Sequence, residues 1–448
     1  MVHLGLGNFF RAHPCWYAEH AADADVWGFA AFTGRASQAV IDQLAGQHGL
    51  YTLVARGRDA DEFEVISSLA QGHVAADNGA WLQYFRSPEL AAVTITVTEA
   101  GYFRGAAGGL DAGRPEVQAD IEVLRADRTG VVSTAPARLV GGLAARRRAN
   151  AGPVALVPCD NTPGNGALTD RVVRDLARLV DSGLADWISD SVAVVTSVAD
   201  RITPRATPDD VRAVLESTGV DDRCPVVTEP GHEWVLSGKF PAGRPHWEDA
   251  GAIFTDDITP YEQRKLWLLN GAHSLLAYAG SIRGHDTVAA AMADETCATW
   301  VAEWWAAASR HLNGPAASLT DYRAALVRRF ANARIRDRLD RIAADGSQKL
   351  PIRVLPVIRA ERAMGRLPIG ATRVLAAWIC YLRHTGPAAA DARAAEVVPL
   401  AAGQLGVAVP RVLGWLDAPL GCDADVTAAV VERCQELSRM TQPAGHTA

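Results

Sequence analysis

The start of the chain limits its possible folds more than any other stretch. Residues 2–6 form a short apolar run that enters a glycine turn at residues 5–7, and residues 11–22 then have helical character. A strand, a glycine turn and a helix in this order begin a dinucleotide-binding fold, because the turn lets backbone N–H groups approach a pyrophosphate. Phe10 occupies the third glycine position of the usual G-x-G-x-x-G pattern. An ordinary strand-to-helix turn is therefore the alternative interpretation.

Strand and helix signals alternate along the first part of the chain and then separate. Short apolar runs bounded by turn residues recur up to about residue 255, beyond which strand signals nearly vanish. The predicted fold class is α/β, with a Rossmann-type dinucleotide-binding domain at residues 1–255 and a mainly α-helical domain at residues 256–448. The strands expected in the first domain lie at residues 2–6, 27–33, 51–55, 63–67, 93–97, 154–157 and 192–197.

Charge and cysteine content exclude several classes of protein. The net charge is −7, from 44 basic and 51 acidic residues without a long run of one sign, so nothing favours a nucleic-acid or membrane partner. Seven cysteines without a C-x-x-C pair are typical of a reduced, intracellular chain. No secretory segment is visible, and no apolar run approaches the roughly 18 residues of a membrane span, so we expect a cytoplasmic protein. No cluster has zinc-ligand spacing, and we therefore expect no metal.

The stretch that most suggests catalysis opens the second domain. Residues 259–273, T-P-Y-E-Q-R-K-L-W-L-L-N-G-A-H, begin with a capping-box pattern and read as an apolar helix carrying Glu262, Lys265, Asn270 and His273. At roughly 100° per residue, these four side chains fall within one broad sector. Burial lowers the pKa of a lysine, so Lys265 is a candidate general base, and the amide and imidazole could hydrogen-bond a substrate oxygen. Alternatively, the lysine reaches solvent while the other two satisfy buried backbone groups.

Polar side chains follow predicted strands of the first domain. Asn161 lies in such a turn, where its amide could donate to a carbonyl oxygen or simply hold the turn. Asp200 follows another strand and could face a ligand or pair with Arg201. Arg35 stands where a dinucleotide fold carries the residue that faces the adenosine ribose. An arginine there could pair with a 2′-phosphate, so the choice between NAD and NADP stays open.

A cluster of cations lies between two predicted helices of the second domain. Residues 341–353 place Arg341, Lys349 and Arg353 around a glycine turn. Three cations in this arrangement could clamp an oxygen-rich ligand. The composition favours the alternative, a solvated corner between helices.

Six sequence blocks follow one another along nearly the whole chain. The blocks are H-L-G-L-G-N-F-F-R-A-H at residues 3–13, T-V-T-E-A-G-Y at 96–102, C-D-N-T-P-G-N-G at 159–166, D-R-I-T-P at 200–204, K-L-W-L-L-N-G-A-H at 265–273 and D-G-S-Q-K-L-P at 345–351. Together they resemble the polyol-specific long-chain dehydrogenase/reductase family, which includes mannitol 2-dehydrogenase and fructuronate (mannonate) reductase. Six blocks in order are much more specific than any one.

The resemblance implies a metal-independent oxidoreductase that uses NAD or NADP. Lys265 would be the general base in oxidation and the acid in reduction, while Asn161 and Asn270 would polarise the reacting oxygen. His273 would orient the substrate. The positions that match polyol-binding residues are Asp200, Arg341 and Lys349, and Glu262 could relay the proton to solvent, although its capping-box position explains it equally well. The candidates for cofactor binding are Gly5, Gly7, Asn8, Phe9, Arg35 and Glu99.

Three functions follow as hypotheses. The leading one is a mannitol 2-dehydrogenase-like enzyme that interconverts a polyol and its 2-ketose. The second is a fructuronate reductase (D-mannonate oxidoreductase), because the guanidinium of Arg353 could hold a carboxylate bidentately. Outside the enzymes, the chain could be a nucleotide-binding sensor without turnover. The expected partners are a small-molecule polyol, ketose or hexuronate, and the expected assembly is a monomer or small homo-oligomer.

Overall fold

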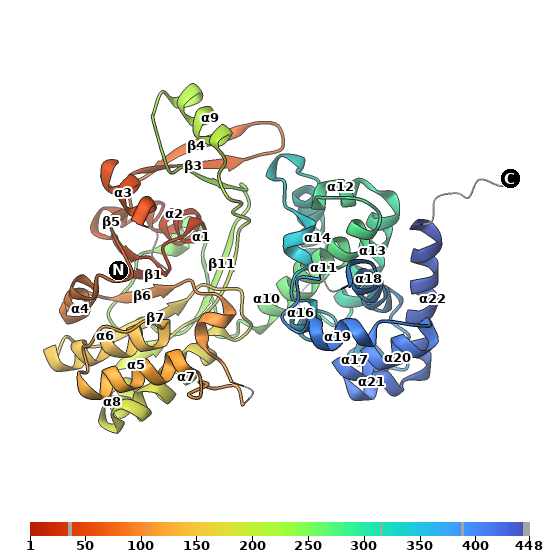
Figure 1. Cartoon of the computed structure of the whole chain (residues 1–448). Coiled ribbons are helices and arrows are strands. Elements are labelled where there is room, and N and C mark those ends of the chain that lie inside the picture. The colour runs from red at the N-terminus through yellow and green to blue at the C-terminus, as the bar shows by residue number, and fades with distance from the viewer. Residues whose placement is uncertain (35–37, 106, 314–315, 387–388, 442–448) are drawn as a thin grey trace. The chain divides into compact units, whose positions relative to one another are not determined.

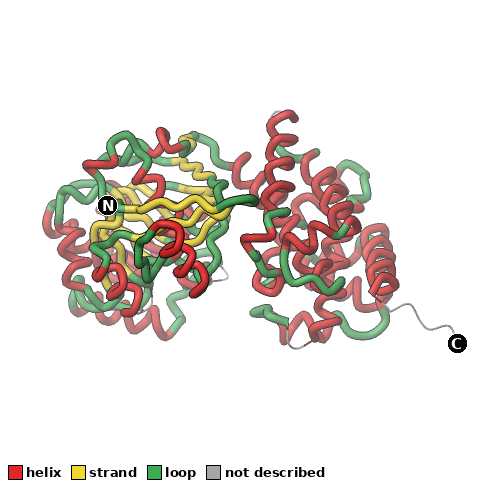
Figure 2. The backbone as a smooth tube through the Cα atoms, turned by 90° about the horizontal axis from the view of Figure 1, so that it is seen from above, coloured by secondary structure: helices red, strands yellow, loops and turns green. Residues whose placement is uncertain are grey.

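The chain forms two compact units, Met1–Ile258 and Thr259–Ala448. The computed structural model describes residues 1–34, 38–105, 107–313, 316–386 and 389–441. Figure 2 shows the strands gathered in the first unit, whereas the second is built from helices and their connections. The prediction of a Rossmann-type unit followed by a mainly helical one is therefore confirmed at the level of fold class.

The centre of the first unit is a six-stranded sheet in which every neighbouring pair is parallel. The strand order is β5-β2-β1-β6-β7-β8, and Val2 of β1 pairs with Ala30 on one side and Val93 on the other. The order along the chain reverses between β1 and β6, which is where open α/β sheets bind ligands at the carboxyl ends of their strands. The strands are β1 (Val2–Leu4), β2 (Phe29–Phe32), β5 (Leu69–His73), β6 (Ala92–Ile95), β7 (Val154–Pro158) and β8 (Val192–Val194).

Both faces of the central part of the sheet are buried, because successive side chains of β2, β6 and β7 enter different hydrophobic clusters. Val2, Leu4 and Val93 pack with the helices that follow β5, β6 and β7, and Phe29 and Ala31 pack with the helices near the N-terminus. The helices of the first unit are α1 (Asn8–Ala12), α2 (Pro14–Glu19), α3 (Gln38–Gly46), α4 (Asn78–Arg86), α5 (Pro115–Ala126), α6 (Ala135–Ala149), α7 (Asn165–Val180), α8 (Ser182–Ser191) and α9 (Pro208–Thr218) (Figure 1).

Two smaller sheets complete the first unit. The strands predicted at residues 51–55 and 63–67 are confirmed as an antiparallel pair, which belongs to a separate sheet with β10. The single strand predicted at residues 192–197 is wrong, because the chain leaves the central sheet after β8 and pairs antiparallel with β11 as β9. The strands of these sheets are β3 (Tyr51–Arg56), β4 (Asp61–Ile66) and β10 (Val226–Thr228), and β9 (Thr196–Asp200), β11 (Glu233–Ser237) and β12 (Ile253–Phe254).

The core of the second unit lies among α11, α13 and α18. Tyr278, Trp304 and Trp378 are fully buried there, and α18 approaches α13 so closely that a Cβ at Gly370 would lie 2.5 Å from the backbone of Glu303. No helix among the described residues is long and apolar enough to cross a membrane. The helices are α10 (Thr259–Arg264), α11 (Gly271–Ile282), α12 (Val288–Ala293), α13 (Glu295–Ser309), α14 (Ala316–Phe330), α15 (Leu339–Ala343), α16 (Gly346–Arg353), α17 (Leu355–Ala363), α18 (Ile369–Thr385), α19 (Ala394–Leu400), α20 (Leu405–Leu416), α21 (Ala418–Cys422) and α22 (Ala424–Thr441), with the π-helix η4 (Lys265–Asn270) between α10 and α11.

Candidate active site

The glycine turn after β1 is held against the end of β6. Gly5 has a φ of +116°, and a Cβ there would lie 2.1 Å from the carbonyl oxygen of Thr96, so only glycine fits. The Thr96 hydroxyl donates to the Gly5 carbonyl at 2.8 Å and lies 2.9 Å from His3 Nε2. Burial lowers the pKa of His3 to about 3, so its imidazole is neutral at pH 7. The turn is thus fixed by a buried chain of neutral hydrogen bonds.

Phe10 explains why the third glycine of the usual pattern is absent. Its ring is buried, stacks on His3 with centroids 3.6 Å apart and meets Phe29 edge-on at 5.1 Å. The side chain therefore fills core between β1 and β2, on the inner side of the turn. At Gly7 an added Cβ would meet only the Gly5 carbonyl oxygen, at 3.6 Å, so the outer side of the turn stays bare.

The neighbours of the turn that we predicted for cofactor binding are described in part. Asn8 opens α1, accepts from Arg11 Nη2 at 2.9 Å and donates to the Pro204 carbonyl at 3.4 Å. Phe9 is half-buried and stacks on His13 at 5.0 Å. Glu99 is exposed in the 3-10 turn Glu99–Tyr102, which follows β6. Arg35 lies outside the described residues.

The turn after β7 carries Asn161 at its exposed surface. The turn is held from below by Asn165, whose buried amide donates to the Pro158 carbonyl at 3.3 Å and exchanges two hydrogen bonds of 3.0 Å with the backbone of Ser197. Since β1, β6 and β7 are parallel neighbours, the turns that carry Gly5, Glu99 and Asn161 all lie along the same edge of the sheet. This edge is where the sequence predicted the ligand.

Two residues that hold this edge were missed by the sequence reasoning. Asn165 was not singled out, although it lies inside the block at residues 159–166, because its two shortest hydrogen bonds join it to Ser197, 32 residues further along the chain. Asp160 accepts hydrogen bonds from the Tyr102 hydroxyl and from the Thr162 amide, the latter at 2.9 Å. Burial raises the pKa of Asp160. The only signal for either residue was its place inside a family block.

Asp200 ends β9 and is buried, opposite Glu233 of β11. The next residue, Arg201, lies over the ring of Trp16 at 5.1 Å and donates to the carbonyls of Ala12 and Glu229. Burial lowers the pKa of Arg201 to about 10, which leaves it protonated at pH 7. The guanidinium is therefore part of the packing of the first unit.

In the second unit, the predicted regular helix at residues 259–273 is wrong in its middle. Lys265–Asn270 is a π-helix, in which the amide of Gly271 donates to the carbonyl of Leu266, five residues back. The expected spacing of roughly 100° per residue therefore does not hold between the two ends of the stretch. A periodicity count assumes one helix type throughout, so it could not reveal this change.

The π-helix η4 buries the side chains of both Lys265 and Asn270, which are 7% and 6% exposed. The amide nitrogen of Asn270 is buried and has no hydrogen-bond partner among the described residues. An unsatisfied buried donor costs about 1–3 kcal/mol, so its presence points to a ligand that supplies an acceptor. Glu262 precedes η4 in α10 and is half-buried, and His273 follows it in α11, with its ring 4.7 Å from that of Phe330.

The three predicted cations have different surroundings. Arg341 is exposed on α15. Lys349 donates through Nζ to the carbonyls of Ile342 and Ala344, which stabilises the C-terminal end of α15. Arg353 is buried and donates from Nη1 to Ser274 Oγ at 3.1 Å, as well as to the Asn270 carbonyl at 3.5 Å. The structure thus brings Arg353 to the same backbone segment as Asn270.

Comparison with known proteins shows that both units match models of the same protein family. The model of the mannitol dehydrogenase Rossmann domain matches residues 1–249, and that of the mannitol dehydrogenase C-terminal domain matches residues 257–400. The chain belongs to the mannitol dehydrogenase family. Among curated members, the D-mannonate oxidoreductase of Escherichia coli (strain K12) is 33% identical over 89% of this chain and 82% of its own length. The mannitol 2-dehydrogenase of Cereibacter sphaeroides is 33% identical over 85% of this chain and 80% of its own.

A solved member of the mannitol dehydrogenase family has the same fold. The structure of Pseudomonas fluorescens mannitol 2-dehydrogenase, a ternary complex with NAD and D-mannitol, matches with a TM-score of 0.86. The two chains are 32% identical, and the match covers 98% of this chain and 93% of the other. The resemblance found in the six sequence blocks is therefore confirmed for the family and the fold.

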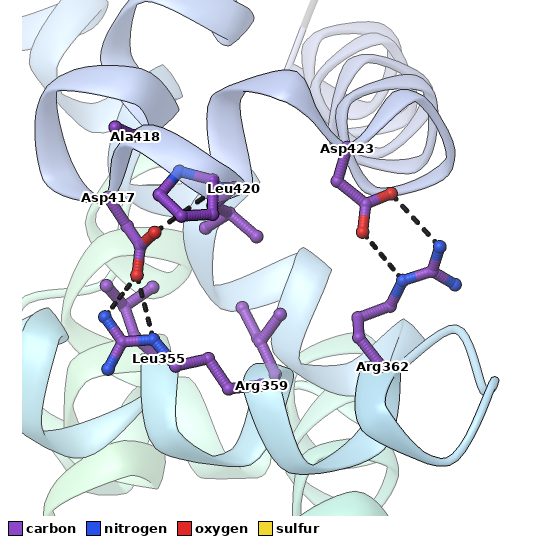
Figure 3. Close-up of a pocket in the computed structure, with 9 residues that line it drawn as sticks. Leu355, Arg359, Arg362, Asp417, Ala418, Leu420 and Asp423 are labelled. Atoms are coloured by element: carbon purple, nitrogen blue, oxygen red, sulfur yellow. Dashed lines mark hydrogen bonds and ion pairs between the residues drawn. The ribbon is translucent and has the colours of Figure 1, made fainter.

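The helical unit of this chain also contains a pocket, and none of the predicted site residues line it. It has a volume of about 530 Å³ and lies between α17 and α21 (Figure 3). Its two arginines are paired with carboxylates, Arg359 with Asp417 and Arg362 with Asp423. Because these charges are already balanced, the pocket gives no argument for an anionic substrate. No group of three or more potential metal ligands occurs among the described residues.

Proposed function

We propose that this protein is an NAD(P)-dependent dehydrogenase that interconverts a sugar alcohol and its ketose, with mannitol and fructose as the leading pair. The observation that carries the proposal is that η4 buries two groups: the amine of Lys265, and the amide of Asn270, whose nitrogen has no hydrogen-bond partner among the described residues. These are the groups needed to take a hydroxyl proton and to stabilise the oxygen left behind. Relatives that are named mannitol 2-dehydrogenase support the substrate class.

The bare turn after β1 fits a dinucleotide. A Cβ at Gly34, after β2, would meet only Gly5 Cα, at 4.0 Å, and Gly7 is equally open. A surface of this kind at the switch point of a parallel sheet suits a pyrophosphate. The nicotinamide supplies or accepts the hydride. We assign to cofactor binding Gly5, Gly7, Asn8, Phe9 and Glu99, and we retain Arg35 from the sequence, with NAD favoured by the solved relative and NADP kept as the alternative.

In the proposed oxidation, the hydroxyl of the substrate loses its proton as the hydride leaves the carbon that carries it. Lys265 takes the proton at Nζ in the oxidation and returns it in the reduction. Asn270 donates to the reacting oxygen through its amide, and Asn161 is assigned the same task from its family block. The remaining assignments also follow the family blocks: His273 orients the substrate, Asp200, Arg341 and Lys349 hold its other hydroxyls, and Glu262 passes the proton to solvent.

A fructuronate reductase is the second candidate. One relative is named D-mannonate oxidoreductase, and Arg353 places a guanidinium against the backbone of Asn270. If Arg353 holds a carboxylate, Arg353→Ala should slow turnover of fructuronate much more than turnover of fructose. An equal loss with both substrates would show that the guanidinium only supports the helix.

The test of the proposed function is a set of initial rates with one purified preparation. Oxidation of NADH and of NADPH is followed with fructose and with fructuronate. A rate with fructose supports the polyol dehydrogenase and ranks the two cofactors, and a rate confined to fructuronate selects the hexuronate reductase. Turnover of either substrate excludes a nucleotide-binding sensor, whereas tight cofactor binding without turnover of any ketose would favour it.

A further inference from the structure

The backbone of η4 is bonded by two indoles from another helix. Trp304 Nε1 donates to the Trp267 carbonyl at 2.7 Å, and Trp305 Nε1 donates to the Leu268 carbonyl at 2.8 Å. The two donors are consecutive residues of α13, and the two acceptors are consecutive carbonyls of the π-helix. Two side chains of α13 thus form hydrogen bonds to the backbone of this one turn. These bonds form without either ring binding a ligand.

The last carbonyl of η4 is bonded as well. Ser274 Oγ donates to the Asn270 carbonyl at 3.1 Å, and Arg353 Nη1 donates both to that carbonyl, at 3.5 Å, and to Ser274 Oγ. Side chains of other helices therefore bond three carbonyls of a six-residue segment, whereas the Ser274 bond is one that serines also make to the fourth residue back in regular helices. Carbonyls inside a regular α-helix are bonded by their own helix, so this is not an ordinary helix environment.

A glycine makes room for one of the indoles. A Cβ at Gly271 would lie 2.6 Å from Trp304 Cζ2 and 2.7 Å from its Nε1. Gly271 has an ordinary helical backbone, with φ −65° and ψ −44°, so it is not required by conformation. It is required by the close approach of the ring, which would be displaced by a single methyl group.

These contacts supply what a π turn lacks. A π-helix is rare and is usually confined to one turn, because its hydrogen bonds span five residues instead of four and its backbone competes with the α-helix. Hydrogen bonds from other helices to its carbonyls make a return to the α-helix less favourable. A return would also rotate Asn270 with respect to Lys265, because the number of residues per turn would change.

We propose that Trp304 and Trp305 are positioning residues, which hold η4 in its π-helical form and thereby set the placement of Lys265 relative to Asn270. The inference rests on the proposed function for its effect on catalysis, but not for its effect on the backbone. Neither indole is required to touch substrate or cofactor. The two tryptophans act on the reaction through the geometry of the turn. A displacement of a catalytic group by about 1 Å can lower the rate about a hundredfold.

The test compares Trp304→Phe and Trp305→Phe with Trp300→Phe. Trp300 lies on the same helix and is equally buried, but its ring lies against Arg373, with the guanidinium 4.6 Å from the centroid. In the two test variants we expect kcat to fall by roughly ten- to a hundredfold, with the Kd for NADH changed by no more than about twofold. The pKa that governs the pH profile of kcat/KM should also move. In Trp300→Phe, kcat and the pH profile should stay as in the wild type.

A backbone measurement makes the test independent of catalysis. Hydrogen exchange of the amides at residues 266–273 should be roughly tenfold faster in the two test variants than in Trp300→Phe, because the turn has lost an outside bond. Unchanged exchange and unchanged kcat in an active protein would overturn the inference while leaving the proposed function intact. An inactive wild type would overturn the proposed function, and exchange alone would then decide the role of the indoles.

Gly271→Ala provides a second route if a tryptophan variant does not fold. The methyl group would push Trp304 from the Trp267 carbonyl without removing a ring, and the same changes in kcat and exchange are expected. Its matched control is Gly406→Ala, a helical position in α20 where an added Cβ meets nothing within 4 Å. Equal behaviour of the two alanine variants would contradict the proposal.

Discussion

Lys265 and Asn270 are both buried, and this burial gives each of them its proposed use. For Lys265→Ala we expect turnover to fall by roughly 10²- to 10⁴-fold, because the group that takes the hydroxyl proton is removed. Binding of NADH should stay nearly intact, and calorimetric titration would show this. Weaker cofactor binding with unchanged turnover at saturation would contradict the assignment of the lysine as base.

Asn270 allows a sharper test, because its amide nitrogen has no hydrogen-bond partner among the described residues and therefore adds no hydrogen bond to the fold. Asn270→Leu should lower kcat by roughly a hundredfold while changing the free energy of unfolding by no more than about 1 kcal/mol. Asn165→Leu is the contrasting variant, because that amide makes four hydrogen bonds inside the first unit. It should lose several kcal/mol of stability by urea unfolding. A large loss of stability in Asn270→Leu would mean that its amide has a structural role.

Among the elements, α13 and α17 are joined by a buried carboxylate. Glu361 of α17 is fully buried and pairs with Arg310 at 2.6 Å, with Arg366 at 3.0 Å and with His311. Burial alone would raise the pKa of Glu361, but the hydrogen bonds from Arg310, Arg366 and His311 outweigh it and hold the pKa well below its usual range. The charged form is therefore favoured by folding.

The sign of the pH dependence follows from that lowered pKa. A group whose pKa is depressed in the folded state contributes stability above its unfolded value, 4.5 here, and loses it as the pH falls toward the folded value. We expect the melting temperature of the wild type to decrease as the pH is lowered below about 4.5. Glu361→Gln should have a lower melting temperature than the wild type at pH 7, but its melting temperature should decrease less in acid. Parallel pH curves for the two proteins would contradict this role of Glu361.

The elements also show what the sequence could predict and what it could not. Buried strands and amphipathic helices leave local periodicities, so the Rossmann-type sheet and the helical second unit were both expected. The π-helix at residues 265–270 was not, because local periodicity assumes one helix type throughout, and the two indoles that bond its carbonyls lie 37 residues further along the chain than their acceptors. The division of residues 192–197 between two sheets was missed for the same reason, since Ser197 is placed by Asn165 and by β11.

At the level of the whole molecule, the proposed functions are divided between two units with separate cores. The proposed cofactor residues lie near the strand ends of the first unit, and the proposed proton-transfer residues lie on the first helices of the second. A ligand that binds only the folded protein raises its stability, by about 2.7 kcal/mol at a hundred times its Kd. NADH should therefore raise the temperature at which the first unit unfolds, whether or not a substrate is present.

Gly7→Ala tests this division. Gly7 is extended, with φ −145° and ψ −174°, and an added Cβ would meet only the Gly5 carbonyl oxygen, so the fold should tolerate alanine. The methyl group would stand on the bare side of the turn, and we expect the Kd for NADH to rise at least about tenfold with an unchanged melting temperature of the free protein. Unweakened binding would show that the turn does not approach the pyrophosphate.

The π-helix η4 has one more consequence, which concerns the length of the chain. A π turn closes over one residue more than an α turn, so η4 is equivalent to an α-helix that has gained a single residue. Deleting one residue between Lys265 and Asn270 would let the segment continue as a regular α-helix with its two ends oriented as before, and the wider turn that carries Lys265 and Asn270 would be lost. The residue count of this segment therefore matters as much as its side chains, and a one-residue deletion there should harm the protein more than a longer deletion in a surface loop.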